Sequence, residues 1–282
     1  MTLADFLDHH DAVIAVKLTR VRGSSPREVG ATMYVKDNAI HGTIGGGQLE
    51  YMAIDKARAL LRQGTTESAM DVPLGPEIGQ CCGGRVELSL VLMDNAARQT
   101  AIEDEARIQA TRPHVYIFVS VHIVRALADL FAHLPVRTIL IDSRPDELSM
   151  ATDQVEHRLS PLPEATLRNA PTGSAFIILT HDHALDFLLT SEALAREDAA
   201  YVGMIGSATK RARFDRFCRE TTDGLSTAPL ACPMGARGSP DKRPEVIASF
   251  IVAEVMAALT TDTPGKAHSS GSKASPQTTE PR

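Results

Sequence analysis

The chain has 282 residues, of which 43% are apolar, and its formal net charge is −6. This length is enough for two domains with separate cores, and the negative charge leaves no broad basic surface for nucleic acid. The N-terminal stretch MTLADFLDHHDAVIAVKLTR carries acids where a signal peptide would be basic, and its apolar run is too short to cross a bilayer. We therefore expect a cytosolic globular protein without nucleic-acid or membrane partners.

Residues 1–94 are expected to form a mixed α/β domain. Strands are predicted over 11–19, 31–37, 40–44 and 85–94, where Val, Ile and Leu are frequent or alternate with polar residues. Residues 48–63 have apolar side chains at helical spacing, and Gly64 is placed to end that helix. Residues 95–112 are rich in Ala, Glu, Arg and Gln and lack a strong apolar stripe, so they predict an exposed linking helix.

Residues 113–260 alternate between strand-like and helix-like segments. HVYIFV, VRTILID, SAFIILT and YVGMIG have the composition of buried strands, and amphipathic segments separate them. This alternation predicts a Rossmann-like, doubly wound parallel sheet. A last helix is expected from Arg243 or Pro244 to about Leu259. The polar segment 261–282 predicts a disordered tail.

Three consecutive glycines, Gly45, Gly46 and Gly47, lie between a strand-like run and a helix. Exposed N–H groups and the helix dipole could form an anion site there, whereas the alternative is a flexible turn without a ligand; we favour the ligand. The upstream loop GSSPR adds two hydroxyls and a planar donor fork, from Ser24, Ser25 and Arg27. Glu50, in the first helical turn, could favour the helix dipole or accept hydrogen bonds from a ligand ring.

The segment GQCCGG contains two of the four cysteines, followed by two glycines: Cys81, Cys82, Gly83 and Gly84. Adjacent cysteines would close only a strained disulfide, and they lack the C-x-x-C spacing of a zinc site. Free cysteines usually pack as small apolar residues. Flanking glycines argue against a packed core, so we interpret the pair as thiols in a ligand-binding loop.

The second domain lacks the dinucleotide fingerprint G-x-G-x-x-G. Valine stands at each glycine position, at Val119, Val121 and Val124, although Asp142 is placed like a ribose-binding acid. Ordinary NAD binding is therefore doubtful. In THDH, His181 and His183 could bind a metal or shuttle protons, or they could merely stand exposed beside a helix cap, and both alternatives stay open.

Glycine also stands at the next strand-to-helix turn of this domain, in the segment YVGMIGSATK. Gly206 and Ser207 begin that turn, and the basic residues that follow make it a second candidate anion site.

Five segments together resemble the XdhC/CoxI family: GSSPREVGATM, GTIGGGQLE, GPEIGQCCGGRVEL, THDHALD and YVGMIGS. The closing segment PMGARGSPDKRPEVIA is similar to the family's C-terminal part, so the resemblance covers nearly the whole chain except the tail. One departure is that the family's GAGHVG pattern is reduced here to His122.

The resemblance implies a chaperone that binds molybdenum cofactor (molybdopterin) as cargo, supports its sulfuration by a cysteine desulfurase and delivers it to xanthine dehydrogenase. It implies no catalytic residue and no resident metal, and it suggests a homodimer. The cofactor-binding residues we assign, with Cys82 preferred over Cys81, are Ser24, Ser25, Arg27, Gly45, Gly46, Gly47, Glu50, Cys81, Cys82, Gly83, Gly84, His181, Gly206 and Ser207.

Two alternatives are kept beside the chaperone. The first is an NAD(P)-dependent oxidoreductase that uses the second domain, against which the three valines argue. The second is a zinc protein, which requires Cys81 or Cys82 to lie near His181 or His183.

Overall fold

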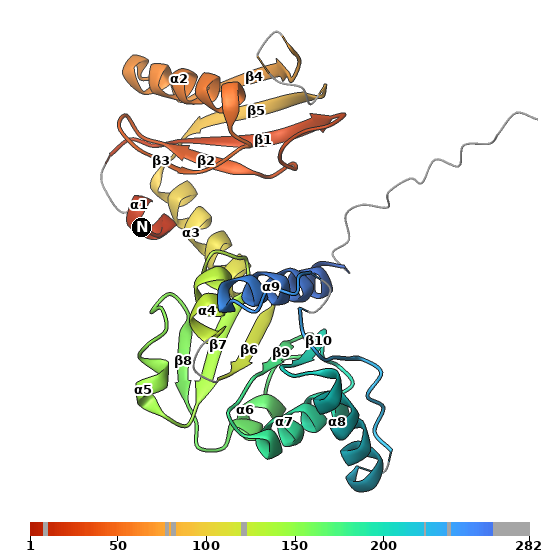
Figure 1. The fold of residues 1–282 in the computed structure, drawn as a ribbon. Coiled ribbons are helices and arrows are strands. Elements are labelled where there is room, and N and C mark those ends of the chain that lie inside the picture. The colour runs from red at the N-terminus through yellow and green to blue at the C-terminus, as the bar shows by residue number, and fades with distance from the viewer. Residues whose placement is uncertain are drawn as a thin grey trace, which may run out of the picture. The chain divides into compact units, whose positions relative to one another are not determined.

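The computed structural model describes residues 1–7, 11–76, 79, 83–119, 123–222, 224–235 and 238–261. They form two compact units, the first ending at Thr111 and the second beginning at Arg112 (Figure 1). The helix expected as a link between domains, α3 (Asn95–Ala110), belongs to unit 1. The predictions for Cys81, Cys82, Val121, His122 and the tail after Thr261 lie outside the described residues.

Unit 1 contains an antiparallel five-stranded sheet in the order β3-β2-β1-β5-β4. Its strands are β1 (Ile14–Arg22), β2 (Thr32–Val35), β3 (Ile40–Gly42), β4 (Glu67–Pro73) and β5 (Arg85–Leu92). Strand β4 was not predicted, because only Val72 among its residues is buried and its sequence lacks an apolar alternation. It is an edge strand, where pairing with β5 substitutes for burial.

Helix α2 (Gly47–Gln63) covers one face of this sheet (Figure 1). Its buried residues Leu49, Ala53 and Leu60 share a core with the inward positions of β1, Val16 and Leu18. The helix ends at Gly64 in a left-handed conformation, as predicted. Helix propensity alone would leave so short a segment marginal, so this apolar contact is what stabilises α2.

The second face of the sheet carries a smaller cluster. Helix α1 (Leu3–Leu7) was not predicted, since it has only five residues, but its Leu3, Phe6 and Leu7 are buried. They pack with Val13 and Met93, and partly buried residues of α3 border the same cluster. Helix α3 itself has no buried residue, in agreement with its missing apolar stripe.

Unit 2 contains a parallel six-stranded sheet in the order β11-β10-β9-β6-β7-β8, which confirms the predicted doubly wound fold. The strands are β6 (His114–Phe118), β7 (Arg137–Asp142), β8 (Glu156–Leu159), β9 (Ala175–Ile178), β10 (Tyr201–Met204) and β11 (Leu230–Ala231). The chain reverses its direction of winding between β6 and β9, and ligand crevices of such folds lie at the carboxyl ends of those strands.

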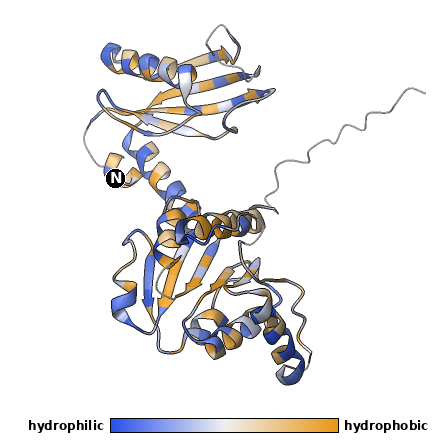
Figure 2. Cartoon of the chain, in the orientation of Figure 1, coloured by the Kyte–Doolittle hydropathy of each residue, from blue (hydrophilic) through white to orange (hydrophobic). Residues whose placement is uncertain are grey.

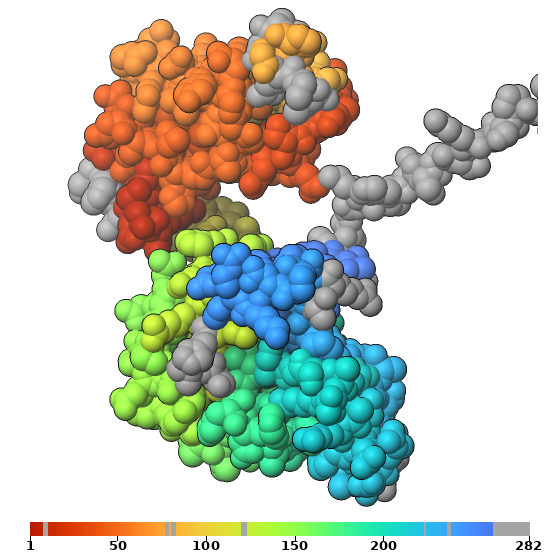
Figure 3. Space-filling view, viewed as in Figure 1, coloured from red at the N-terminus to blue at the C-terminus, as the bar shows by residue number. Residues whose placement is uncertain are grey.

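Helices cover both faces of the unit 2 sheet. Helices α4 (Ile123–Ala132) and α9 (Pro244–Thr260) pack on one face, and α9 forms part of the outer surface of this unit (Figure 3). Helices α6 (Pro163–Arg168), α7 (His183–Ala195) and α8 (Ala208–Thr221) pack on the other face, and the short α5 (Pro145–Leu148) follows β7. Central strands β6 and β7 are almost wholly buried and have apolar middles, whereas the edge strand β8 is polar and was not predicted (Figure 2). No helix in the described ranges is long and apolar enough to cross a membrane.

Candidate functional site

The loop after β1, which contains Ser24 and Ser25, lies in close contact with the segment before β5, which contains Gly83 and Gly84. A Cβ atom added to Gly84 would lie 2.0 Å from the carbonyl oxygen of Ser24, so only glycine fits this position. Gly84, which we had assigned to a ligand, is therefore required by backbone packing. The contact fixes the serine-containing loop beside Gly83, which is covalently bonded to Cys82.

The triple-glycine turn approaches the same loop. A Cβ atom added to Gly45 would lie 2.9 Å from the Pro26 Cβ. Gly45, Gly46 and Gly47 have φ angles of 130°, 77° and 64°, which residues with side chains rarely adopt. The backbone path thus requires all three glycines, whether or not a ligand binds.

Glu50 interacts with this turn rather than standing free. Its Oε2 atom accepts hydrogen bonds from the Thr43 hydroxyl at 2.6 Å, the Gly46 N–H at 3.0 Å and the Ile44 N–H at 3.2 Å. The Gly45 N–H donates to the Thr43 hydroxyl at 3.1 Å. The N–H groups of Gly45 and Gly46, which we had assigned to a phosphate, are therefore already engaged by the protein's own groups, and Glu50 holds the turn closed.

Two side chains of the serine-containing loop retain unused hydrogen-bonding capacity. The Ser25 hydroxyl oxygen is buried, and no group of the described chain bonds to it. Within the same described ranges, the Arg27 guanidinium forms no ion pair with, and no hydrogen bond to, any side chain, and it borders a hollow of about 600 Å³ between the sheet and α3. The Ser25 hydroxyl and the Arg27 guanidinium, rather than the N–H groups of Gly45 and Gly46, are therefore donors available to a ligand.

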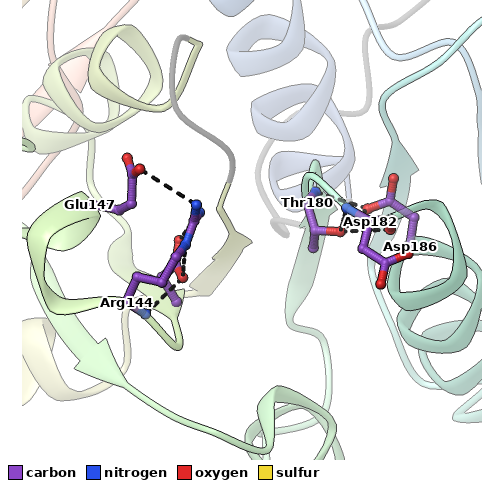
Figure 4. Close-up of polar contacts among 6 residues, drawn as sticks. Arg144, Glu147, Thr180, Asp182 and Asp186 are labelled. Carbon is purple, nitrogen blue, oxygen red and sulfur yellow. Dashed lines mark hydrogen bonds and ion pairs between the residues drawn. The ribbon is translucent and has the colours of Figure 1, made fainter.

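In unit 2, the expected dinucleotide site is closed by the chain's own residues. Val119 and Val124 are buried in the apolar core, so these two valines contribute to packing. Both Asp142 oxygens accept hydrogen bonds from Arg144, at 3.1 Å from Nε and 2.8 Å from Nη2, and these bonds raise the pKa of Arg144 (Figure 4). An aspartate engaged in this way is poorly available to a ribose.

The THDH segment and the following helix form a buried polar network. Asp186, which is fully buried, accepts hydrogen bonds from the backbone and the hydroxyl of Thr180, each at 2.8 Å (Figure 4). Lys210 of α8 pairs with its second oxygen. Asp182 caps α7 by accepting from the Ala184 N–H at 2.7 Å. The segment therefore does cap a helix, which was one of the two alternatives for it. The buried pair of Asp186 and Lys210 was not predicted from the sequence.

The predicted residues of unit 2 border two different hollows. His181 borders one of about 260 Å³ with Asp142 at the carboxyl ends of β6 and β7. Gly206 and Ser207 border a more open one of about 470 Å³ with His183. Ser207 accepts from the Lys210 N–H at 3.4 Å and is the N-cap of α8. Thr180 borders both hollows, so His181 and the other two predicted residues lie at neighbouring hollows rather than in one.

The two described cysteines, Cys218 and Cys232, lie in unit 2. Cys218 is buried in α8, and burial raises the pKa of its thiol as well as that of half-buried Cys232. Among the described residues, no three His, Cys, Asp or Glu side chains are grouped so that they could hold a metal ion.

Comparison with known proteins gives two family matches. Residues 6–72 match the model described as the XdhC and CoxI family, and residues 115–255 match the XdhC Rossmann domain. The chain is also similar to the 2.80 Å crystal structure of a xanthine dehydrogenase from Bacillus halodurans, with a TM-score of 0.77 and 17% identity over 94% of this chain and 97% of that chain. At this identity the similarity concerns the fold. No curated protein matches. The resemblance predicted from the five motifs is confirmed.

Proposed function

Because the chain belongs to the XdhC and CoxI family, we propose that it is a non-enzymatic chaperone for molybdenum cofactor. It binds the cofactor as cargo, protects it, supports its sulfuration by a cysteine desulfurase and delivers it to apo xanthine dehydrogenase. The similar solved structure bears the name of a xanthine dehydrogenase, which supports this choice of client.

One observation carries the proposal: in unit 1 the serine-containing loop, the glycine turn and the start of β5 converge. Gly84 contacts Ser24 and Gly45 contacts Pro26, so the three segments carrying most of the family motifs form one cradle. In the sequence, Cys81 and Cys82 directly precede Gly83, the first residue of the glycine pair at the start of β5.

The donor set of the cradle fits a phosphorylated pterin. Arg27 would bind the phosphate through its planar donor fork, and the unpartnered Ser25 hydroxyl would donate to an oxygen of the ligand. When bound, the cofactor supplies a molybdenum–dithiolene centre, for which thiolates are suitable soft ligands. Cys82 is the preferred thiol. Glu50 has a different role in this proposal, since it holds the glycine turn.

Cofactor retention tests the proposal. Purified protein is incubated with molybdenum cofactor, re-isolated by gel filtration, and analysed for pterin and molybdenum. We expect near-stoichiometric retention by the wild type and loss in Cys82→Ala, with Cys232→Ala as the matched control in unit 2. Transfer is then measured as xanthine oxidation after apo xanthine dehydrogenase and a desulfurase are added.

Two outcomes would contradict the proposal. Failure of the wild type to retain cofactor would remove the chaperone function, and full retention by Cys82→Ala would remove that thiol from the site. The same preparation tests two further expectations. Light scattering should report a homodimer, and titration with NADH or NADPH should show no binding, because Asp142 is engaged by Arg144.

A further inference from the structure

A hollow of about 600 Å³ lies within unit 1, between the second face of the sheet and α3. Its volume falls in the range of small-molecule sites. The hollow exists because α3 has no buried residue and does not pack closely over the strands. It shares Arg27 with the proposed cradle, although most of its lining residues belong to none of the family motifs.

The floor of the hollow is one cross-strand row of the sheet. Val91, Ala15, Tyr34 and His41 are successive partners across β5, β1, β2 and β3. The rings of Tyr34 and His41 lie 6.4 Å apart, and the small side chain of Ala15 leaves room beside them. A floor formed by two aromatic rings beside a small residue suits a flat ring system.

Acidic groups of α3 form the opposite wall. Asp104 and Glu105 border the hollow, and both act electrostatically on Tyr34. Burial, followed by these two carboxylates, raises the pKa of Tyr34, so its hydroxyl stays neutral and can donate or accept. Glu105 accepts one hydrogen bond from Gln109 at 2.7 Å, which leaves most of its acceptor sites available.

Cations lie further along the strands. Lys17 is two residues beyond Ala15 on β1, about 7 Å along the strand, and Arg27 follows in the loop after β1. In the described part of the chain, neither side chain takes part in an ion pair or a side-chain hydrogen bond. The hollow therefore offers acceptors at one end and unpaired positive charge at the other.

We infer that this hollow holds the pterin ring of the cargo, with the amino and N–H edge toward Glu105 and the anionic substituent toward Lys17 and Arg27. The inference rests on the proposed function, and it assigns the ring to residues outside the family motifs. Carboxylates are suited to a ring edge that carries adjacent N–H donors, and the free cations are suited to phosphate. Guanine presents the same edge, so the shared chemistry is a 2-amino-4-oxo ring with an anionic arm.

Fluorescence titration of the full-length protein with pterin-6-carboxylate tests the inference without molybdenum. We expect wild-type binding, roughly tenfold weaker binding in Glu105→Gln because a charge-assisted hydrogen bond is lost, and a similar loss in Lys17→Met. The matched control is Glu103→Gln, an exposed carboxylate of the same helix that does not border the hollow; it should change affinity less than twofold. Circular dichroism confirms that each variant is folded.

Three outcomes would overturn the inference: no binding of the probe by the wild type, wild-type affinity in both Glu105→Gln and Lys17→Met, or displacement by GMP at lower concentration than by the pterin itself. The retention assay separates the two proposals. If the wild type retains molybdenum and both variants retain as much, the assignment of the pterin ring to this hollow is wrong, while the proposed chaperone function is supported. If the wild type retains none, the proposed chaperone function is wrong, and the pterin titration then tests separately whether the hollow binds a pterin ring.

Discussion

The two units treat charge differently at the places where a ligand is expected. In unit 2, the cations nearest the strand ends are paired with buried carboxylates, Arg144 with Asp142 and Lys210 with Asp186. In unit 1, Lys17 and Arg27 have no such partner among the described residues, and the one carboxylate of the glycine turn, Glu50, is bonded to neutral donors. An anionic ligand would therefore gain more from unit 1.

The difference also separates two uses of polar residues. Buried pairs stabilise a unit only as long as both partners are present, because a single buried charge is costly. Exposed, unpaired charges contribute little to stability and remain available for binding. The predictions below test this division, from the largest expected effect to the smallest.

Asp186→Asn should lower the free energy of unfolding by about 3 kcal/mol, because it leaves Lys210 without its buried partner. Urea unfolding at pH 7 measures the loss. The control Asp182→Asn changes an exposed carboxylate of the same loop and should cost little, since Asn also caps helices well. Recovery of stability in Asp186→Asn/Lys210→Met would support the pairing, whereas equal losses in the two single variants would contradict it.

Gly84→Ala should destabilise unit 1 by about 2 kcal/mol, because the new methyl group would collide with the Ser24 backbone. The matched variant in unit 2 is Gly206→Ala, whose methyl group would meet the Lys210 side chain rather than backbone, and it should cost less. Thermal unfolding followed by circular dichroism compares the two. A Gly84→Ala variant as stable as the wild type would mean that the close approach of the unit 1 loops is not needed for stability.

Glu50→Gln should cost about 1 kcal/mol, since it weakens three hydrogen bonds that remain partly accessible to water. The effect is expected to be smaller than that of Asp186→Asn, where a charge is left unpaired. Asp55→Asn, on the exposed side of the same helix, is the control. A loss from Glu50→Gln as large as that from Asp186→Asn would remove the distinction between the units.

The smallest expected effect concerns the Arg168–Glu192 pair on the surface of unit 2, whose contribution to stability should decrease in acid. The hydrogen bond from Arg168 lowers the pKa of Glu192, so the pair's contribution to stability is present above the unfolded pKa and is lost as pH falls through the folded pKa. Arg168→Met should lower the free energy of unfolding only slightly at pH 7, because Arg168 is exposed. Urea titrations at pH 7 and pH 3 should show this difference shrinking; a difference that grows in acid would contradict the assignment.

Much of the fold could be predicted from the sequence because its core strands are nearly all apolar. Periodicity located β1, β5, β6, β7 and α2, and strand–helix alternation predicted the parallel sheet. The missed strands β4, β8 and β11 are edge strands. β4 and β8 are polar, β11 has only two residues, and each is held by pairing with one neighbouring strand. The missed helices α1, α5 and α6 are too short for a periodic signal.

The candidate site was predicted less completely, for a physical reason. Motifs identify the residues of a loop, but they do not identify which backbone donors the chain uses itself; the bonds from the glycine turn to Glu50 became visible only in the structure. Likewise, Lys17 and Tyr34 carry no motif. Their only signal is that they are polar or amphipathic residues on the strand face opposite the core, which is common in antiparallel sheets.

The β4–β5 hairpin has a further consequence. Gly83 N–H donates to the Leu74 carbonyl at 2.9 Å, and Leu74 N–H donates to the Gly84 carbonyl at 2.7 Å, so the hairpin is closed at its base before the cysteine segment begins. Strand register is thereby set independently of residues 75–82, and loop-closure entropy changes only slowly with length. We therefore expect that replacing residues in this segment, or changing its length, leaves the register of β4 and β5 unchanged.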